Sequence, residues 1–374
     1  MRVVLLMVTL LASAAFAADA KTKTTMRTAL HSTLWLQPYL VSPAAFRDPA
    51  NAPAIKGHLE VLANLEHHFA TREKADAATR AIAGMLGAQV RRSLTDFNAG
   101  DPEPARARLR SLTSVCFACH SRDAVATDFD DTEKAVEALR LPPLRQAELY
   151  ASTRQFDRAI AVWKDALARP AKTDAEWFEQ TAALRQYLAV LVRVKDDKAG
   201  TAAAITEQAQ RDGVPVFFQH LLDAWFTEVR VWNEDAFDAR AATPLVLFKK
   251  GAALIADADL ERQVVADERR FISMLRATAY LSAALERAPD ATWRGEALFF
   301  LGVASAATQD PLLWNLDALF LETCVREQPH TRIARRCVTR LSERTWLRWT
   351  GSGGTDIPPE ELRTLAWLRS LAAP

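Results

Sequence analysis

The sequence predicts an all-α fold, built as an N-terminal four-helix bundle followed by an α-solenoid of helical hairpins. Only 12 of the 374 residues are glycine, and alanine, leucine and arginine are abundant, a composition that favours helix. Apolar residues also recur at steps of three and four along most of the chain, which is the period of an amphipathic helix. At roughly 150 residues per domain, the length predicts about two domains.

The N-terminus has the features of a secretory signal peptide, predicted over residues 1–17. Arg2 begins a short basic region, Val3 to Leu11 is a largely apolar run, and Ala15-Phe16-Ala17 is a cleavage site of small residues. We expect cleavage after Ala17 and a periplasmic or otherwise exported protein. No later segment reaches about 18 consecutive apolar residues, so no membrane span is predicted. The net charge of +1 gives no reason to propose nucleic acid or an anionic membrane as a partner.

Four helices are predicted in the N-terminal domain, residues 21–125. They are expected at about 25–41, 54–70, 74–98 and from Pro102 through the segment near residue 119. Prolines between the first two predict a loop, Gly100 ends the third helix, and Asp101 caps the fourth. The apolar stripes expected on the first three helices are Met26, Leu30, Leu34 and Gln37 or Val41; Ile55, Leu59, Leu62, Leu65 and Phe69; and Ile82, Leu86, Val90, Leu94 and Phe97. Short connections favour an antiparallel bundle.

The strongest functional motif is Cys116-Phe117-Ala118-Cys119-His120, a C-x-x-C-H run. In such a run the two thiols add across the vinyl groups of one haem, and the histidine ligates its iron. On a helix, Cys116, Cys119 and His120 would share one face, because positions i, i+3 and i+4 are neighbours there. The two cysteines also continue the apolar stripe of the predicted fourth helix. We therefore predict one covalently bound haem c against the interior of the bundle.

Two other chemistries use the same residue types. A C-x-x-C pair can be a redox dithiol, which would be expected between a strand and a helix, whereas this segment is surrounded by predicted helices. The run could also be half of a zinc site, which needs further cysteine or histidine ligands, and none cluster nearby in the sequence. Haem attachment is favoured because it also agrees with export.

A haem motif late in the last helix of a four-helix bundle resembles cytochrome c′ and its relatives, and the resemblance covers residues 21–125. It implies that Cys116 and Cys119 hold the haem through thioethers and that His120 is the proximal iron ligand. Basic residues usually follow the haem histidine in that family. Here Arg122 is the residue that does so, which makes it the candidate partner for the haem edge.

The sixth coordination position of the iron separates a ligand-binding haem from an electron carrier. In the cytochrome c′ family an apolar side chain of the first helix commonly blocks this position, and Leu30 and Leu34 are the matching candidates. Met26 lies on the same predicted helix, where a b-type relative of this bundle carries an axial methionine. His68 borders the apolar stripe of the second helix and is the other candidate ligand, with a solvated helix end as its alternative role.

The second predicted domain, residues 130–374, contains helical repeats. Its stretch 144–170 resembles a tetratricopeptide repeat, with Ala147, Tyr150, Ala159, Trp163 and Ala166 at spacings of 3, 9, 4 and 3. The small residues let two antiparallel helices approach closely, and the aromatic ones fill the space between them. Further helices are expected at about 176–194, 202–211, 217–232, 245–256, 261–288, 332–349 and 360–371, with a second recognisable repeat beginning at Leu298, Leu301 and Gly302. About four to six hairpins would stack as a solenoid.

Two further details of this domain carry alternatives. Cys324 and Cys337 flank the turn around Pro329, and in an exported protein a disulfide is favoured over two buried thiols. The glycine-rich stretch 350–355 lacks the Gly-Lys-Ser/Thr sequence and the preceding strand of a phosphate-binding loop. A flexible connection is expected there instead.

These observations favour an extracytoplasmic monohaem c-type cytochrome that transfers electrons, with the repeat domain docking a protein partner. The alternative is a haem protein that binds or senses a diatomic gas, nitric oxide or carbon monoxide, and signals through the repeats. An enzyme such as a haem peroxidase is less favoured, because no motif specifies a distal acid–base group. A scaffold in which haem only stabilises the bundle is the fourth hypothesis.

Overall fold

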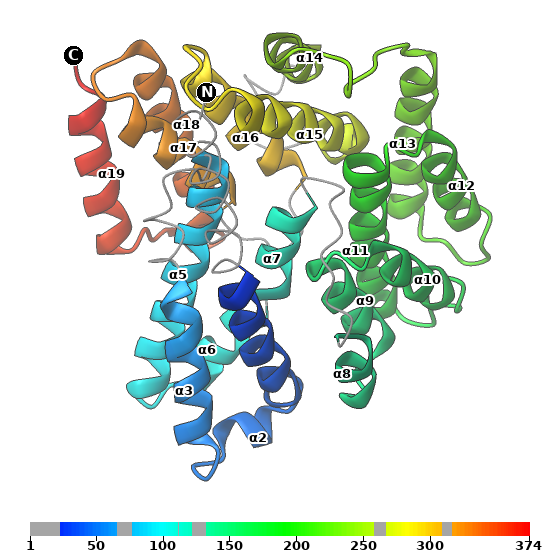
Figure 1. Ribbon diagram of the computed structural model, residues 1–374, viewed down its shortest axis with the longest axis vertical. Helices are drawn as coiled ribbons and strands as arrows, with labels where there is room; N and C mark the ends of the chain where they lie inside the picture. The colour runs from blue at the N-terminus through cyan, green and yellow to red at the C-terminus, as the bar shows by residue number, and fades with distance from the viewer. Residues whose placement is uncertain (1–22, 66–76, 111, 122–131, 258–266, 309–315) are drawn as a thin grey trace, which may run out of the picture. The chain divides into compact units, whose positions relative to one another are not determined.

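The computed structural model describes residues 23–65, 77–110, 112–121, 132–257, 267–308 and 316–374 (Figure 1). It is 78% helix and 1% strand, which confirms the all-α prediction. No helix within these residues is long and apolar enough to cross a membrane. The predicted signal peptide lies outside the described residues, as do His68 and Arg122.

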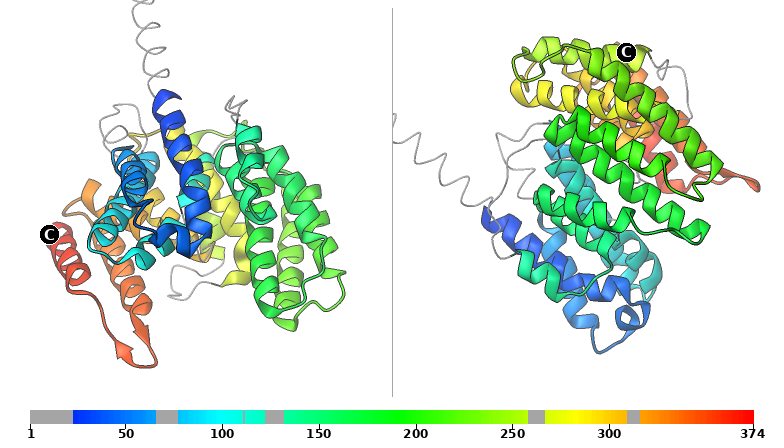
Figure 2. Two further views of the ribbon diagram at one scale, coloured as in Figure 1. Left: turned by 90° about the horizontal axis from the view of Figure 1, so that it is seen from below. Right: turned by 90° about the vertical axis from the view of Figure 1, so that its right-hand side faces the viewer.

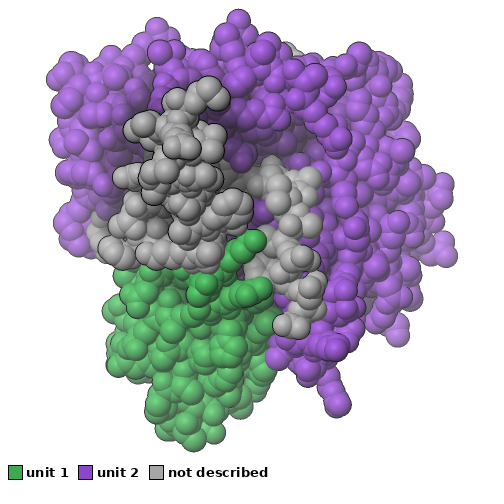
Figure 3. Space-filling model, in the orientation of Figure 1, with its two compact units in different colours: residues 1–75, 83–112 green, residues 76–82, 113–374 purple. Residues whose placement is uncertain are grey.

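The chain forms two compact units (Figure 3). Unit 1 comprises residues 1–75 and 83–112, and unit 2 comprises residues 76–82 and 113–374. The sequence places the C-x-x-C-H motif in the N-terminal bundle, whereas in the structure its residues belong to unit 2. The boundary therefore falls within the predicted fourth helix.

The helices of unit 1 surround one apolar core. They are a helix at residues 23–41, α2 (Pro43–Arg47), α3 (Ala52–Ala63), α5 (Ala77–Asn98) and α6 (Pro102–Leu109). The core contains Leu36, Leu40, Phe46, Ile55, Leu59, Leu62, Leu65, Val90, Ala105, Leu109 and Leu112. In the first helix Leu36 and Leu40 are buried, whereas Leu30 and Leu34 of the predicted stripe are half-buried and Val41 is exposed. The second half of this helix, and not the first, thus supplies most of its buried side chains.

A short helix, α2, occupies the stretch where prolines predict a loop. Ser42 caps it, because its Oγ accepts a hydrogen bond from the N–H of Ala45 at 3.2 Å. Pro43 stands at the start of the helix, where its missing N–H would have no intrahelical partner. The buried ring of Phe46 packs edge-on against Phe97 of α5, with ring centroids 5.4 Å apart. The loop prediction is wrong here because proline can begin a helix as well as interrupt one.

The predicted fourth helix is two helices, α6 and α7 (Leu112–His120), whose side chains bond to different partners. In α6, Arg106 donates to the carbonyl of Leu40 at 2.8 Å, and Arg108 pairs with Asp96 of α5 at 2.7 Å. The side chains of α7 bond instead to α9 in unit 2. A continuous apolar stripe carries no sign of such a change of partner, so the prediction of a single helix is wrong.

Unit 2 is a series of helices that pack mainly on their neighbours in the chain (Figures 1 and 2). They are α7, α8 (Thr132–Ala138), α9 (Pro143–Ser152), α10 (Phe156–Leu167), α11 (Asp174–Val190), α12 (Lys198–Ala209), α13 (Val216–Glu234), α14 (Pro244–Asp257), α15 (Phe271–Arg287), α16 (Arg294–Ala307), α17 (Leu316–Glu327), α18 (Arg332–Arg348) and α19 (Pro359–Ala372). The pairs α9 and α10, α14 and α15, and α16 and α17 are in the most extensive contact. Neighbour-on-neighbour packing is the expected behaviour of a chain built from helical hairpins.

Small residues stand where paired helices approach each other. In the α9–α10 pair, the predicted positions Ala147, Tyr150, Ala159 and Trp163 are all buried. In the α16–α17 pair, a Cβ on Gly302 would lie 2.7 Å from the Cγ of Leu321, which is closer than real Cβ contacts. Both pairs thus use small side chains to allow close packing, as the sequence pattern predicts.

Residues 350–355 form a small β-hairpin, which corrects the expectation of a flexible connection. Strands β1 (Thr350–Gly351) and β2 (Gly354–Thr355) pair antiparallel. The hydroxyls of Thr350 and Thr355 are 2.7 Å apart, and Gly354 has a φ of 109°, which glycine adopts without strain. One of the glycines that suggest flexibility is therefore required by the turn itself.

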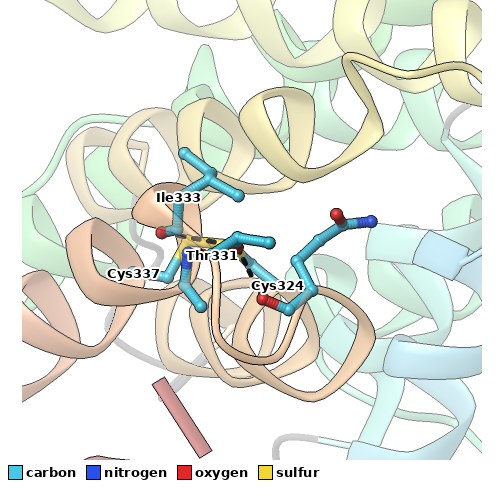
Figure 4. Close-up of a disulfide and its surroundings, with 6 residues drawn as sticks. Cys324, Thr331, Ile333 and Cys337 are labelled. Atoms are coloured by element: carbon cyan, nitrogen blue, oxygen red, sulfur yellow. Dashed lines mark hydrogen bonds between the residues drawn. A yellow bond between two sulfur atoms is a disulfide. The ribbon is translucent and has the colours of Figure 1, made fainter. Parts of the chain in front are cut away.

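Cys324 in α17 and Cys337 in α18 form a disulfide, which confirms the favoured prediction (Figure 4). Both side chains are fully buried. In the turn between the two helices, the backbone N–H of His330 donates to the carbonyl of Leu371 at 2.8 Å. The cross-linked pair of helices therefore also holds the end of α19.

Removing this cross-link should destabilise the protein. The two cysteines are 13 residues apart, and a loop of this size predicts a loss of about 3 kcal/mol in the free energy of unfolding for Cys324→Ala/Cys337→Ala. Urea unfolding followed by far-UV circular dichroism measures the change. Reducing the native protein with dithiothreitol should produce a similar loss, and an unchanged midpoint in both experiments would contradict a stabilising role.

A buried carboxylate, Glu228 of α13, caps the N-terminus of α15. It accepts hydrogen bonds from the backbone N–H groups of Ile272 and Ser273 at 3.0 and 3.3 Å, and from the hydroxyl of Ser273. These N–H groups are among those that a helix leaves unbonded at its start. Burial raises the pKa of Glu228, and the hydrogen bond from the Ser273 hydroxyl is the largest opposing effect.

Two substitutions separate the capping role of Glu228 from its charge. Glu228→Ala should lower the free energy of unfolding by about 2–4 kcal/mol, because buried donors lose their acceptor, whereas Glu228→Gln keeps an acceptor oxygen and should cost less.

The folded protein holds the proton of Glu228 more tightly than the unfolded chain does. The native protein should therefore lose stability as the pH rises above 4.5, the ordinary pKa, and Glu228→Gln should lack this contribution. Identical pH dependence of urea unfolding in both proteins would contradict the expectation.

Candidate functional site

The C-x-x-C-H motif is helical, because α7 runs from Leu112 to His120. Cys116, Cys119 and His120 are therefore attached to one face of this helix. Cys116 and His120 are half-buried, and the side chain of Cys119 lies outside the described residues. The described disulfide does not include Cys116. The described side chains on the face that carries the motif are therefore partly exposed to solvent.

The imidazole of His120 is bonded to the backbone of another helix. Its Nδ1 lies within hydrogen-bond distance of the carbonyl oxygen of Ser152, the last residue of α9. Because a carbonyl oxygen can only accept, Nδ1 must be the donor, and in the neutral ring Nε2 is then the unprotonated nitrogen. Histidines that ligate metals characteristically donate their other ring N–H to a carbonyl or a carboxylate in this way. A neutral His120 ring that makes this hydrogen bond has the tautomer of a metal-ligating histidine.

At the end of α9, local donors bond the carbonyls that precede Ser152, whereas the Ser152 carbonyl bonds to His120. The carbonyl of Leu149 accepts from the hydroxyls of Ser152 and Thr153, each at 2.9 Å. The carbonyl of Tyr150 accepts from the backbone N–H of Gln155 at 2.8 Å. A helix leaves its last four carbonyls without intrahelical partners, and they carry a partial negative charge. A hydrogen bond donated to such a carbonyl makes an imidazole ring more electron-rich.

A second contact places α7 on α9. The hydroxyl of Thr113 donates to Oε2 of Glu148 at 3.4 Å, and Arg145 pairs with the same oxygen at 2.6 Å. Glu148 lies one helical turn before Ser152, so the two contacts are on consecutive turns of α9. The beginning and the end of α7 are therefore both held by the first helix of the predicted repeat hairpin.

Thiol, thiol and imidazole on one helical face form a donor set suited to covalent haem. Ser121, the residue after His120, is fully buried, and its hydroxyl has no hydrogen-bond partner among the described residues. An unbonded polar atom beside the motif is consistent with a further polar group in this region of the folded protein. Within the described residues, no group of three or more His, Cys, Asp or Glu side chains is placed to hold a metal ion.

The residues predicted to stand opposite His120 lie elsewhere in the chain. Met26, Leu30 and Leu34 are half-buried on the helix at residues 23–41, which belongs to unit 1. His68 and Arg122 fall outside the described residues. The sixth iron ligand and the partner of the haem edge therefore stay predictions.

Sequence reasoning missed the α9 residues that position the motif. Ser152 acts through its backbone carbonyl, for which a sequence pattern carries no signal. Thr153 and Gln155 follow the tetratricopeptide-like positions of α9 and look like ordinary turn residues. Only Glu148, an acidic residue one turn before the helix end, has a side chain that could have suggested a polar contact.

Comparison of the chain with protein-family models, with curated proteins and with solved structures found no match. The functional conclusion therefore depends on the motif and on the contacts of α7.

Proposed function

We propose that this chain is an exported monohaem c-type cytochrome. The observation that carries the proposal is the hydrogen bond from His120 to the Ser152 carbonyl, in a helix that also carries Cys116 and Cys119. The motif supplies the residue types for covalent haem, and the hydrogen bond gives the histidine the protonation of an iron ligand. The leader predicted over residues 1–17 and the disulfide between Cys324 and Cys337 support an oxidising, extracytoplasmic location.

In the proposed protein each residue of the motif has one task. The thiols of Cys116 and Cys119 would hold the haem by adding across its two vinyl groups, so that each S–H would become a thioether and its hydrogen would go to a vinyl carbon. His120 would ligate iron through Nε2, and the Ser152 carbonyl would hold the ring in that tautomer. When bound, the group would supply a one-electron couple between ferrous and ferric iron. The electron-rich imidazole of His120 would favour the ferric form and so lower the reduction potential.

The proposed architecture assigns electron exchange and partner recognition to different parts of the chain. We retain a cytochrome c′-like helical bundle and a tetratricopeptide-like solenoid as the finer description of the all-α fold, with α7 on the solenoid side of the boundary. Helical repeats offer extended surfaces for proteins, so the solenoid would dock the redox partner. The contacts of α7 with α9 would then hold the haem-bearing helix close to the first repeat.

A second function is favoured by the same hydrogen bond. If nitric oxide or carbon monoxide bound the iron, a change in the bond to His120 would act directly on the end of α9. A diatomic-gas sensor that signals through the repeats would have this connection. It also requires a sixth position without a strong ligand, as Leu30 or Leu34 would leave it.

One set of spectra tests the proposal and separates the two functions. The full-length protein, produced with a haem c maturation system, is examined by reduced-minus-oxidised absorption with and without carbon monoxide. A reversible haem c spectrum that carbon monoxide leaves unchanged supports an electron carrier, and a shift on adding the gas supports the sensor. Mature protein without covalent haem would overturn both.

A further inference from the structure

Unit 2 exposes an aromatic surface at the beginning of α11 and α13. Phe178 of α11 and Phe217 of α13 stack with ring centroids 5.6 Å apart and 22° between their planes. Their side chains nevertheless remain 62% and 46% exposed, and the neighbouring Val216 is 72% exposed. We call these three residues the Phe178–Phe217 patch.

The core of unit 2 does not require this patch. The adjacent residues in sequence, Trp177 and Phe218, are the buried ones and pack edge-on with centroids 6.1 Å apart. Each helix thus sends one aromatic ring inward for packing and the next ring outward. An aromatic side chain can bury roughly 150–250 Å², and clusters of exposed rings characteristically mark binding surfaces. The outward pair is therefore available to a partner without disturbing the fold.

The charges near the patch select the chemistry of that partner. Residues 172–182 and 211–223 contain five carboxylates and two cationic side chains. One of these cations, Arg211, is bonded to Gln180 and Gln208 and lies over the ring of Trp177. In contrast, none of four exposed carboxylates forms an ion pair within the described residues: Asp174, Glu179, Asp212 and Asp223. The two stretches of sequence that carry the patch therefore have an excess of negative charge.

We propose that the Phe178–Phe217 patch binds a basic segment of a partner protein, one that carries an aliphatic or aromatic side chain between lysines or arginines. The apolar side chain covers the stacked rings, and the cations face the surrounding carboxylates. An anionic lipid surface would be repelled by the same carboxylates. The inference rests on the docking half of the proposed function and is independent of haem.

The test measures binding of a short fluorescein-labelled peptide that alternates lysine with leucine, by fluorescence anisotropy with the full-length protein. Phe178→Ser/Phe217→Ser should weaken binding roughly tenfold or more. Asp174→Asn/Glu179→Gln should weaken it roughly threefold and make it less sensitive to salt. The matched control is Leu245→Ser/Val246→Ser on α14, where both side chains are 44% exposed, and it should bind as the native protein does.

Three results would overturn the proposal: unchanged binding by the phenylalanine variant, an equal loss in the control, or equal binding of a peptide with glutamate in place of lysine. Binding to phosphatidylglycerol vesicles that depends on both phenylalanines would also overturn it, in favour of a membrane. Absorption measures haem content separately. If the protein contains haem but does not bind the peptide, the patch proposal is wrong and the proposed haem function is unaffected. If the protein contains no haem but binds the peptide through the two phenylalanines, the proposed haem function is wrong and the patch proposal is unaffected.

Discussion

Replacing Cys116 and Cys119 by alanine is expected to abolish covalent haem attachment. In the proposed site each thiol would form one thioether, so the double variant would have no bond to haem that survives denaturation. The native protein, matured in a host that attaches haem c, should have an intact mass larger than the polypeptide by one haem. The variant should have the mass of the polypeptide alone, and its denaturing gel should show no haem-dependent peroxidase stain.

Two controls show whether the effect belongs to the motif. Cys324→Ala/Cys337→Ala removes the other two cysteines and should retain the haem, because these form the disulfide between α17 and α18. His120→Ala leaves both thiols and should change the absorption spectrum while the haem stays attached. Haem retained by the Cys116→Ala/Cys119→Ala protein would contradict the assignment of the thioethers.

The elements predicted best are those in which the sequence pattern and the packing partner coincide. In the α9–α10 pair, Ala147, Tyr150, Ala159 and Trp163 are all buried and the two helices are in contact, so the predicted spacing marks buried positions of this pair. The same holds for Gly302, whose lack of a Cβ is needed against Leu321. Burial patterns of this kind depend on the spacing of residues within each helix, so they can be recognised in a single sequence.

The errors arise where one pattern is compatible with two structures. Pro43 is compatible both with a loop and with the first turn of a helix. The helix forms here because the side chain of Ser42 caps α2. The apolar stripe from Pro102 to Cys119 is continuous, although α6 bonds to unit 1 and α7 to α9. A local cap distinguishes the first case and tertiary hydrogen bonds distinguish the second, and the apolar periodicity of the sequence contains neither.

The candidate site likewise has a part with a sequence signal and a part without one. Its donor atoms have a sequence signal, because covalent haem needs two thiols and an imidazole at fixed spacing, and their role as haem ligands stays a prediction. Its positioning group has no such signal, because the Ser152 carbonyl belongs to the backbone, which every residue has. Ser152 ends α9, which packs against α10, so the position of this carbonyl depends on the α9–α10 pair.

The second large effect is expected from Trp163 in α10, which is completely buried and stacks on Tyr187 of α11 with ring centroids 6.1 Å apart. Trp163→Ala should lower the free energy of unfolding by about 3–5 kcal/mol, because it leaves a large cavity between packed helices. The indole N–H has no hydrogen-bond partner among the described residues. Trp163→Phe removes this unbonded donor and keeps most of the volume, so it should cost less than about 2 kcal/mol.

Urea unfolding of the two variants measures these losses, and Trp346→Ala is the control, since that side chain is 53% exposed and should change the stability by less than about 0.5 kcal/mol. Native stability in Trp163→Ala would contradict the packing of α10.

The same variant also probes the site, because a loosened hairpin moves the end of α9 to which His120 is bonded. The haem-loaded Trp163→Ala protein should therefore have a reduction potential that differs from the native value, whereas Trp346→Ala should not. Trp163→Ala could lower the stability and yet leave the reduction potential unchanged. That result would mean that the packing of α9 and α10 does not affect the environment of His120.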